Sequence, residues 1–157
     1  MSNHVAWGSI VVAGLLATAV MTLLMYMGKA MGMKMDMPRM LGLMFAPPES
    51  GGAVYGLGGM AHFVMGVLLA IIYGVIFSLL NLRGGWIWGA IFGVVHAVLA
   101  GMFMAMMPAM HPRMGPGQEL RPPGLFGRNY GTMVPVGLVM MHVIYGALVG
   151  GLYAAGL

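Results

Sequence analysis

The sequence has 157 residues, of which 61% are hydrophobic and 6% are charged, and its formal net charge is +4. Soluble domains carry about 25% charged residues, so this composition excludes a soluble globular enzyme. The absence of cysteine excludes a disulfide scaffold. So small a basic excess on an apolar chain also argues against nucleic-acid binding. We therefore expect one integral membrane domain over residues 1–157.

Four apolar stretches are long enough to cross a bilayer, which takes roughly 20 residues as a helix. They contain no Asp, Glu, Lys or Arg. The expected spans are about Val5–Gly28, Ala53–Leu80, Gly85–Met107 and Gly131–Tyr153. The first lacks a basic segment before it, so we expect a retained span and not a cleaved signal peptide. Because helices satisfy their own backbone groups in lipid, the sequence predicts an all-α, four-helix transmembrane bundle.

The basic residues predict the orientation of the bundle. Six of the seven fall in the first and third connections: Lys29, Lys34, Arg39, Arg113, Arg121 and Arg128. Only Arg83 lies in the second connection. Cytoplasmic loops carry the excess of Lys and Arg, so we expect these two loops in the cytoplasm and both termini outside.

The two halves of the chain match each other when shifted by about 80 residues, which predicts an internal duplication. The clearest match lies in the second and fourth spans, where Met60, His62, Gly66, Leu68, Ala70 and Tyr73 align with Met140, His142, Gly146, Leu148, Gly150 and Tyr153. Repeat one would cover about 5–80 and repeat two about 85–157. Two spans per repeat insert the same way up, so the pseudo-twofold axis would follow the membrane normal.

Small residues at every fourth position predict close helix packing. The hydrophobic effect does not drive helices together in lipid, so their association depends on van der Waals contact between backbones that small residues allow to approach. Such packing could be used within the chain or against a partner. The packing positions are Gly85, Gly89, Gly93 and Gly101 in the third span, Gly66 in the second, and Gly146 and Gly150 in the fourth.

Three histidines fall near the middle of their predicted spans: His62, His96 and His142. Imidazoles on facing helices can ligate haem iron or bind copper or zinc, and an intramembrane ionisable residue is a functional candidate. The alternative is that neutral histidines bridge helices by hydrogen bonds to tyrosines such as Tyr73 or Tyr145. The spans contain no carboxylate, which argues against a di-iron site and against a proton pump.

Methionine is abundant, with 21 residues, and alternates at Met33, Met35 and Met37. An extended segment with this spacing presents its thioethers on one face, and soft sulfur ligands select Cu(I). The alternative is that methionine fills irregular apolar packing.

Three short motifs carry a resemblance: residues 35–42 (MDMPRMLG), residues 126–131 (FGRNYG) and residues 142–146 (HVIYG). Together they resemble a family of short four-span bacterial integral membrane proteins of unknown function. The resemblance implies the four-span fold and a bacterial inner membrane, and it implies no activity.

Three functions fit these features. The favoured hypothesis is a non-catalytic accessory subunit that packs against a larger respiratory or photosynthetic membrane complex, or against itself. The second is a bundle that binds haem b or copper through His62, His142 and His96, with Met33, Met35 and Met37 as further metal ligands. The third is a small oligomeric transporter or channel. We expect no catalytic residues, because nucleotide-binding motifs and spaced acid–base partners are absent from the sequence.

Overall fold

The computed structural model describes residues 5–157 and is helical throughout, with no strand in that range. Its elements are α1 (Trp7–Ala30), α2 (Met37–Gly42), η1 (Pro48–Ser50), α3 (Gly52–Leu79), α4 (Trp86–Met110), η2 (Leu125–Tyr130) and α5 (Met133–Ala155). The expected all-α class is confirmed. Residues 1–4 of the expected domain lie outside the described range.

The four long helices, α1, α3, α4 and α5, are each long and apolar enough to cross a membrane. Each begins and ends within about three residues of the corresponding predicted span. The chain thus has the elements of a multi-pass membrane protein, and the charged residues lie at helix ends and in connections.

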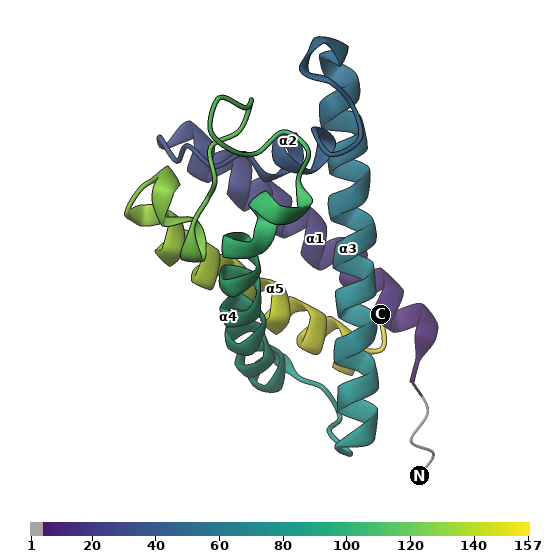
Figure 1. The fold of residues 1–157 in the computed structure, drawn as a ribbon. Helices are drawn as coiled ribbons and strands as arrows, with labels where there is room; N and C mark the ends of the chain where they lie inside the picture. The colour runs from purple at the N-terminus through teal and green to yellow at the C-terminus, as the bar shows by residue number, and fades with distance from the viewer. Residues whose placement is uncertain (1–4) are drawn as a thin grey trace.

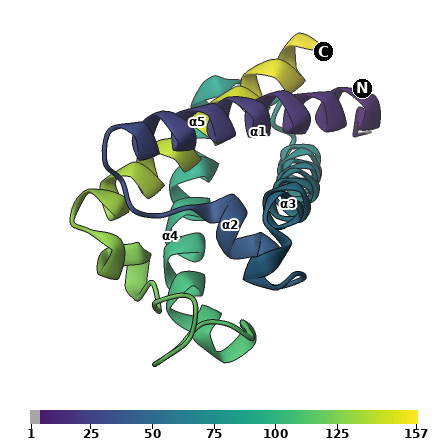
Figure 2. The same ribbon diagram turned by 90° about the horizontal axis from the view of Figure 1, so that it is seen from above.

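The four helices surround a central space unevenly. α1 and α5 cross one another along one side, while α3 and α4 stand apart on either side of them (Figure 1). Seen from above, the short helix α2 lies between α3 and α4 (Figure 2). It therefore covers one end of the space that the long helices enclose.

The α4–α5 pair is held by glycine-to-backbone contacts. A Cβ added at Gly89 would overlap the carbonyl oxygen of Gly146, and one added at Gly150 would overlap that of Gly85. A Cβ at Gly93 would lie 2.5 Å from the carbonyl oxygen of His142. Only glycine allows helices to approach this closely. The stripes of small residues are thus used within the chain.

Two packing positions predicted in the third span make contacts that differ from those of Gly89 and Gly93. Gly85 precedes the helix as its N-cap with φ +100, and its N–H donates to the carbonyl oxygen of Gly150 at 2.7 Å. A Cβ added at Gly85 itself would meet nothing within 4 Å, so Gly85 contacts α5 through its backbone and not through its Cα face. Gly101 packs against the Phe126 ring of η2 and not against another long helix. The remaining predicted position outside the α4–α5 pair, Gly66, packs against Thr18 of α1.

The first and third connections fold over one end of the bundle. α2 begins because the Asp36 side chain accepts a hydrogen bond from the Arg39 N–H and Pro38 occupies the first turn, both of which favour a helix start. The buried His111 ring joins the third connection to α2 through the carbonyl oxygen of Met40 at 2.9 Å. These contacts give an ordered cap and not a pair of free loops.

The packing does not establish the internal duplication. A pseudo-twofold axis would pair α1 with α5 and, equally, α3 with α4. The structure packs the backbones of α1 and α5 closely together, whereas α3 and α4 meet only through long side chains such as Phe77 and Phe92. The duplication therefore stays a prediction from the sequence.

Candidate functional site

A cavity of about 460 Å³ lies between the four long helices and beneath α2. Its lining includes all six residues predicted to bind a cofactor or metal: His62, His96, His142, Met33, Met35 and Met37. These come from α3, α4, α5, the α1–α2 connection and α2. The lining contains no Asp, Glu, Lys or Arg, so the cavity holds neutral donors in apolar surroundings.

Two of the histidines touch. The rings of His96 and His142 have centroids 4.5 Å apart at an interplanar angle of 81°. The His142 Nδ1–H donates to the carbonyl oxygen of Leu138 at 2.7 Å. Since a carbonyl only accepts, this bond places the proton on Nδ1 and leaves Nε2 with a free lone pair. Metal-ligating histidines commonly have such a backbone partner.

His96 also has a helix-bridging contact, as the alternative interpretation expected. Its Nδ1 shares a hydrogen bond with the Tyr73 hydroxyl at 3.3 Å. The Tyr145 ring lies 5.8 Å from the His96 ring, and its hydroxyl donates to the backbone carbonyl of Gly66. These bonds fix the tyrosines and hold His96 near His142.

His62 differs from the other two. It lines the same cavity and is only 5% exposed, yet neither ring nitrogen has a hydrogen-bond partner among the described residues. A buried imidazole without partners costs free energy. The predicted symmetric pair, His62 with His142, is therefore not the pair that the structure brings into ring contact.

Thioethers line much of the remaining wall. The methionines are Met21, Met25, Met33, Met35, Met37, Met65, Met104, Met107 and Met141. Met33 is wedged where α1 and α5 cross, since Cβ atoms added at Gly28 or Gly137 would meet its side chain. Met35 and Met104 both present their sulfur atoms toward Gly127. The alternating segment thus lines the cavity and does not lie on the surface.

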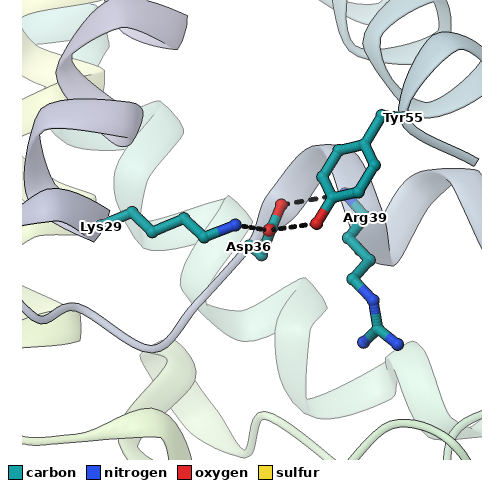
Figure 3. A network of polar contacts seen from close by, with 4 residues as sticks. All are labelled: Lys29, Asp36, Arg39 and Tyr55. Atoms are coloured by element: carbon teal, nitrogen blue, oxygen red, sulfur yellow. Dashed lines mark hydrogen bonds and ion pairs between the residues drawn. The ribbon is translucent and has the colours of Figure 1, made fainter. Parts of the chain in front are cut away.

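A polar network anchors the segment that carries these methionines. The Asp36 carboxylate pairs with Lys29, accepts a hydrogen bond from the Tyr55 hydroxyl at 3.1 Å and caps α2 through Arg39 (Figure 3). The Arg39 side chain pairs in turn with Glu119 of the third connection. The network ties the α1–α2 connection to both α1 and α3 at the capped end of the bundle.

Sequence reasoning missed part of this lining. Met141 of α5 lies one helical turn before Tyr145, a residue already predicted from the sequence as a candidate partner of the histidines. Helical spacing from Tyr145 could have identified Met141. Thr18 and Met21 of α1 carried no comparable signal, because only the crossing of α1 over the cavity places them there.

No group of three or more His, Cys, Asp or Glu suited to a metal ion occurs within residues 5–157. Any metal held in the cavity would therefore need methionine as well as histidine. No protein-family model, curated protein or solved structure matches the chain.

Proposed function

We propose that the protein is a non-catalytic membrane protein that binds a soft monovalent metal ion, Cu(I), in this cavity. His96 and His142 supply imidazole nitrogens, and neighbouring methionines supply thioethers. The observation that carries the proposal is the contact of these two rings, 4.5 Å between centroids, inside a methionine-lined cavity. Two imidazoles that share a tetrahedral ion have centroids about 5 Å apart.

The charge of the lining favours a monovalent ion. Moving a unit charge from water into a medium of low dielectric constant costs of order 20 kcal/mol before compensation, and this Born cost rises with the square of the charge. The lining offers no anion to offset a divalent ion. Thioether and imidazole donors, however, suit soft Cu(I) without a countercharge.

Haem is less well supported than copper. Two imidazoles on opposite faces of one haem iron have centroids roughly 6 Å apart, whereas His96 and His142 are 4.5 Å apart. That pair is too close to enclose a haem.

The accessory-subunit hypothesis loses one of its two supports, the small-residue stripes, and keeps the other, the near absence of polar surface. The glycine stripes that could have met a partner subunit pack within the α4–α5 pair. We retain the bacterial inner membrane and the cytoplasmic placement of the first and third connections as part of the proposal, on the charge distribution and the resemblance given above.

The test is metal content. The protein is purified in mild detergent without chelators, incubated anaerobically with Cu(I) or with its redox-inert analogue Ag(I), and analysed by plasma mass spectrometry. We expect about one ion per chain, loss of the ion in His142→Leu, and weaker binding in Met141→Leu. Met102→Leu is the matched control, because Met102 is outside the lining and 53% exposed. A wild-type protein that takes up neither ion, or a His142→Leu variant that binds as well as wild type, would refute the proposal.

A further inference from the structure

The cavity opens sideways, toward the bilayer, between α3 and α4. Three of its lining residues are also large exposed hydrophobics: Met65 of α3 at 40% exposure, and Leu99 and Phe103 of α4 at 61% and 49%. At the end of the bundle away from α2, α3 and α4 contact each other through the stacked rings of Phe77 and Phe92 and the Tyr73–His96 hydrogen bond. The exposed lining residues lie between these contacts and α2. A molecule dissolved in the membrane can therefore reach the cavity without crossing an aqueous phase.

The size of the cavity exceeds the needs of a metal ion. A water-sized particle occupies about 30 Å³, whereas the cavity measures about 460 Å³. Sites for organic ligands and cofactors are typically about 300–1,000 Å³, mostly apolar, with a few polar groups that orient the ligand. The lining here has that character.

The unpartnered polar group indicates what kind of ligand fits. His62 is 5% exposed and lacks a hydrogen-bond partner at both ring nitrogens among residues 5–157. At 1.5 Å per residue, it lies about 15 Å from the near end of α3. A neutral imidazole carries one N–H donor and one acceptor nitrogen. The ligand must therefore bring a hydrogen-bonding group deep into the apolar layer.

We propose that the cavity binds a lipophilic quinone or its quinol, which enters between α3 and α4 and hydrogen-bonds to His62. A quinone head is apolar enough to enter the hydrocarbon layer and carries ring carbonyls that accept from the imidazole N–H. A phospholipid keeps its polar head at the membrane surface and brings only an acyl chain to this depth, which leaves His62 unpartnered. The quinone uses His62, whereas the proposed metal ion uses His96 and His142 of the same cavity.

The test uses decylubiquinone, a short-tailed quinone, with the purified protein in detergent. Quinone retained after rapid gel filtration is quantified by chromatography. We expect about one quinone per chain and at least tenfold weaker binding in His62→Phe, which keeps an aromatic ring and removes both nitrogens. Ag(I) uptake by the same variant should match wild type, which separates failure of this inference from failure of the metal proposal.

A second pair of variants tests the opening and does not depend on the folding of the His62 variant. The chain has no cysteine, so Leu99→Cys at the opening can be labelled after folding with a bulky maleimide. Val94→Cys is the control, because Val94 is exposed on α4 but does not line the cavity. We expect the label at position 99 to block quinone binding and the label at position 94 to leave it unchanged.

Three results would overturn the inference. One is a wild-type protein that retains phospholipid but no decylubiquinone. Another is binding by His62→Phe that equals that of wild type. The third is equal quinone binding by the two labelled cysteine variants.

Discussion

Replacing Gly93 by alanine tests whether the close approach of α4 and α5 sets the distance between the two imidazoles. An added Cβ would lie 2.5 Å from the carbonyl oxygen of His142 and 2.8 Å from the Cα of Val143. Ordinary van der Waals contact begins near 3.4 Å, so α5 must move by about 1 Å at the residue that carries one imidazole. Gly93 lies one helical turn before the other, His96.

The magnitude follows from two opposing effects. Alanine in place of a helical glycine favours the helix by about 1 kcal/mol, while forced overpacking costs about 1–3 kcal/mol. We therefore expect a net destabilisation of about 0–2 kcal/mol. The effect on metal binding should be larger, since metal–ligand distances tolerate about 0.2 Å and displaced supporting groups typically cost about 10–100-fold in affinity.

The assay combines thermal unfolding in detergent with an Ag(I) titration against a competing chelator. Gly151→Ala is the matched control, because Gly151 lies on α5, the helix that carries His142. A Cβ added at Gly151 would meet only Trp86 of α4 at 3.7 Å, which is an ordinary contact. We expect Gly151→Ala to bind Ag(I) like wild type and to be as stable or slightly more stable. Unchanged Ag(I) affinity in Gly93→Ala would refute the claim that this helix contact positions the imidazoles.

Three further predictions concern the cap and the cavity wall. Asp36→Ala removes the cap of α2 together with the Lys29 and Tyr55 contacts, and we expect a loss of about 1–2 kcal/mol, with faster proteolysis of the α1–α2 connection as the readout. His111→Ala removes the buried contact to Met40, so thermal unfolding should show a loss of about 1–3 kcal/mol, and an unchanged melting curve would contradict the bridging role. Tyr145→Phe removes the hydrogen bond to the Gly66 carbonyl, and thermal unfolding should show a loss of about 1 kcal/mol in stability. Tyr26→Phe is its control and should have no effect, because Tyr26 is outside the cavity lining and 46% exposed.

The spans could be predicted because an uncharged apolar run of about 20 residues can cross a bilayer only as a helix that satisfies its own backbone hydrogen bonds. The depth of the histidines followed from helical rise alone. Their contacts did not follow, because the rotation of each helix depends on which neighbour it packs against. Helical spacing puts His96 seven residues after Gly89 and so near the glycine face of its helix, and this face meets α5 and brings His96 to His142. The same spacing gave no means of telling that His62 would stay without a partner.

The short helix α2 was missed for a different reason. A helix as short as α2 has no hydrophobic period to detect, although Asp36 followed by Pro38 is a recognisable start signal. The 3₁₀ segment η2 contains Phe126 with φ +55, an unusual conformation for a residue with a large side chain. Its ring covers Gly101, and this long-range contact leaves no local trace in the sequence.

The close glycine-mediated packing of α4 against α5 also has a consequence for biosynthesis. Chain segments enter the membrane in the order of their translation, and α5 leaves the ribosome after the other three long helices. Until then α4 lacks the helix against which its glycines pack, and α1 lacks the helix that it crosses. The contact between the imidazoles of His96 and His142 is therefore a late event of assembly, and a nascent chain halted before α5 has the wall of the cavity without its second imidazole.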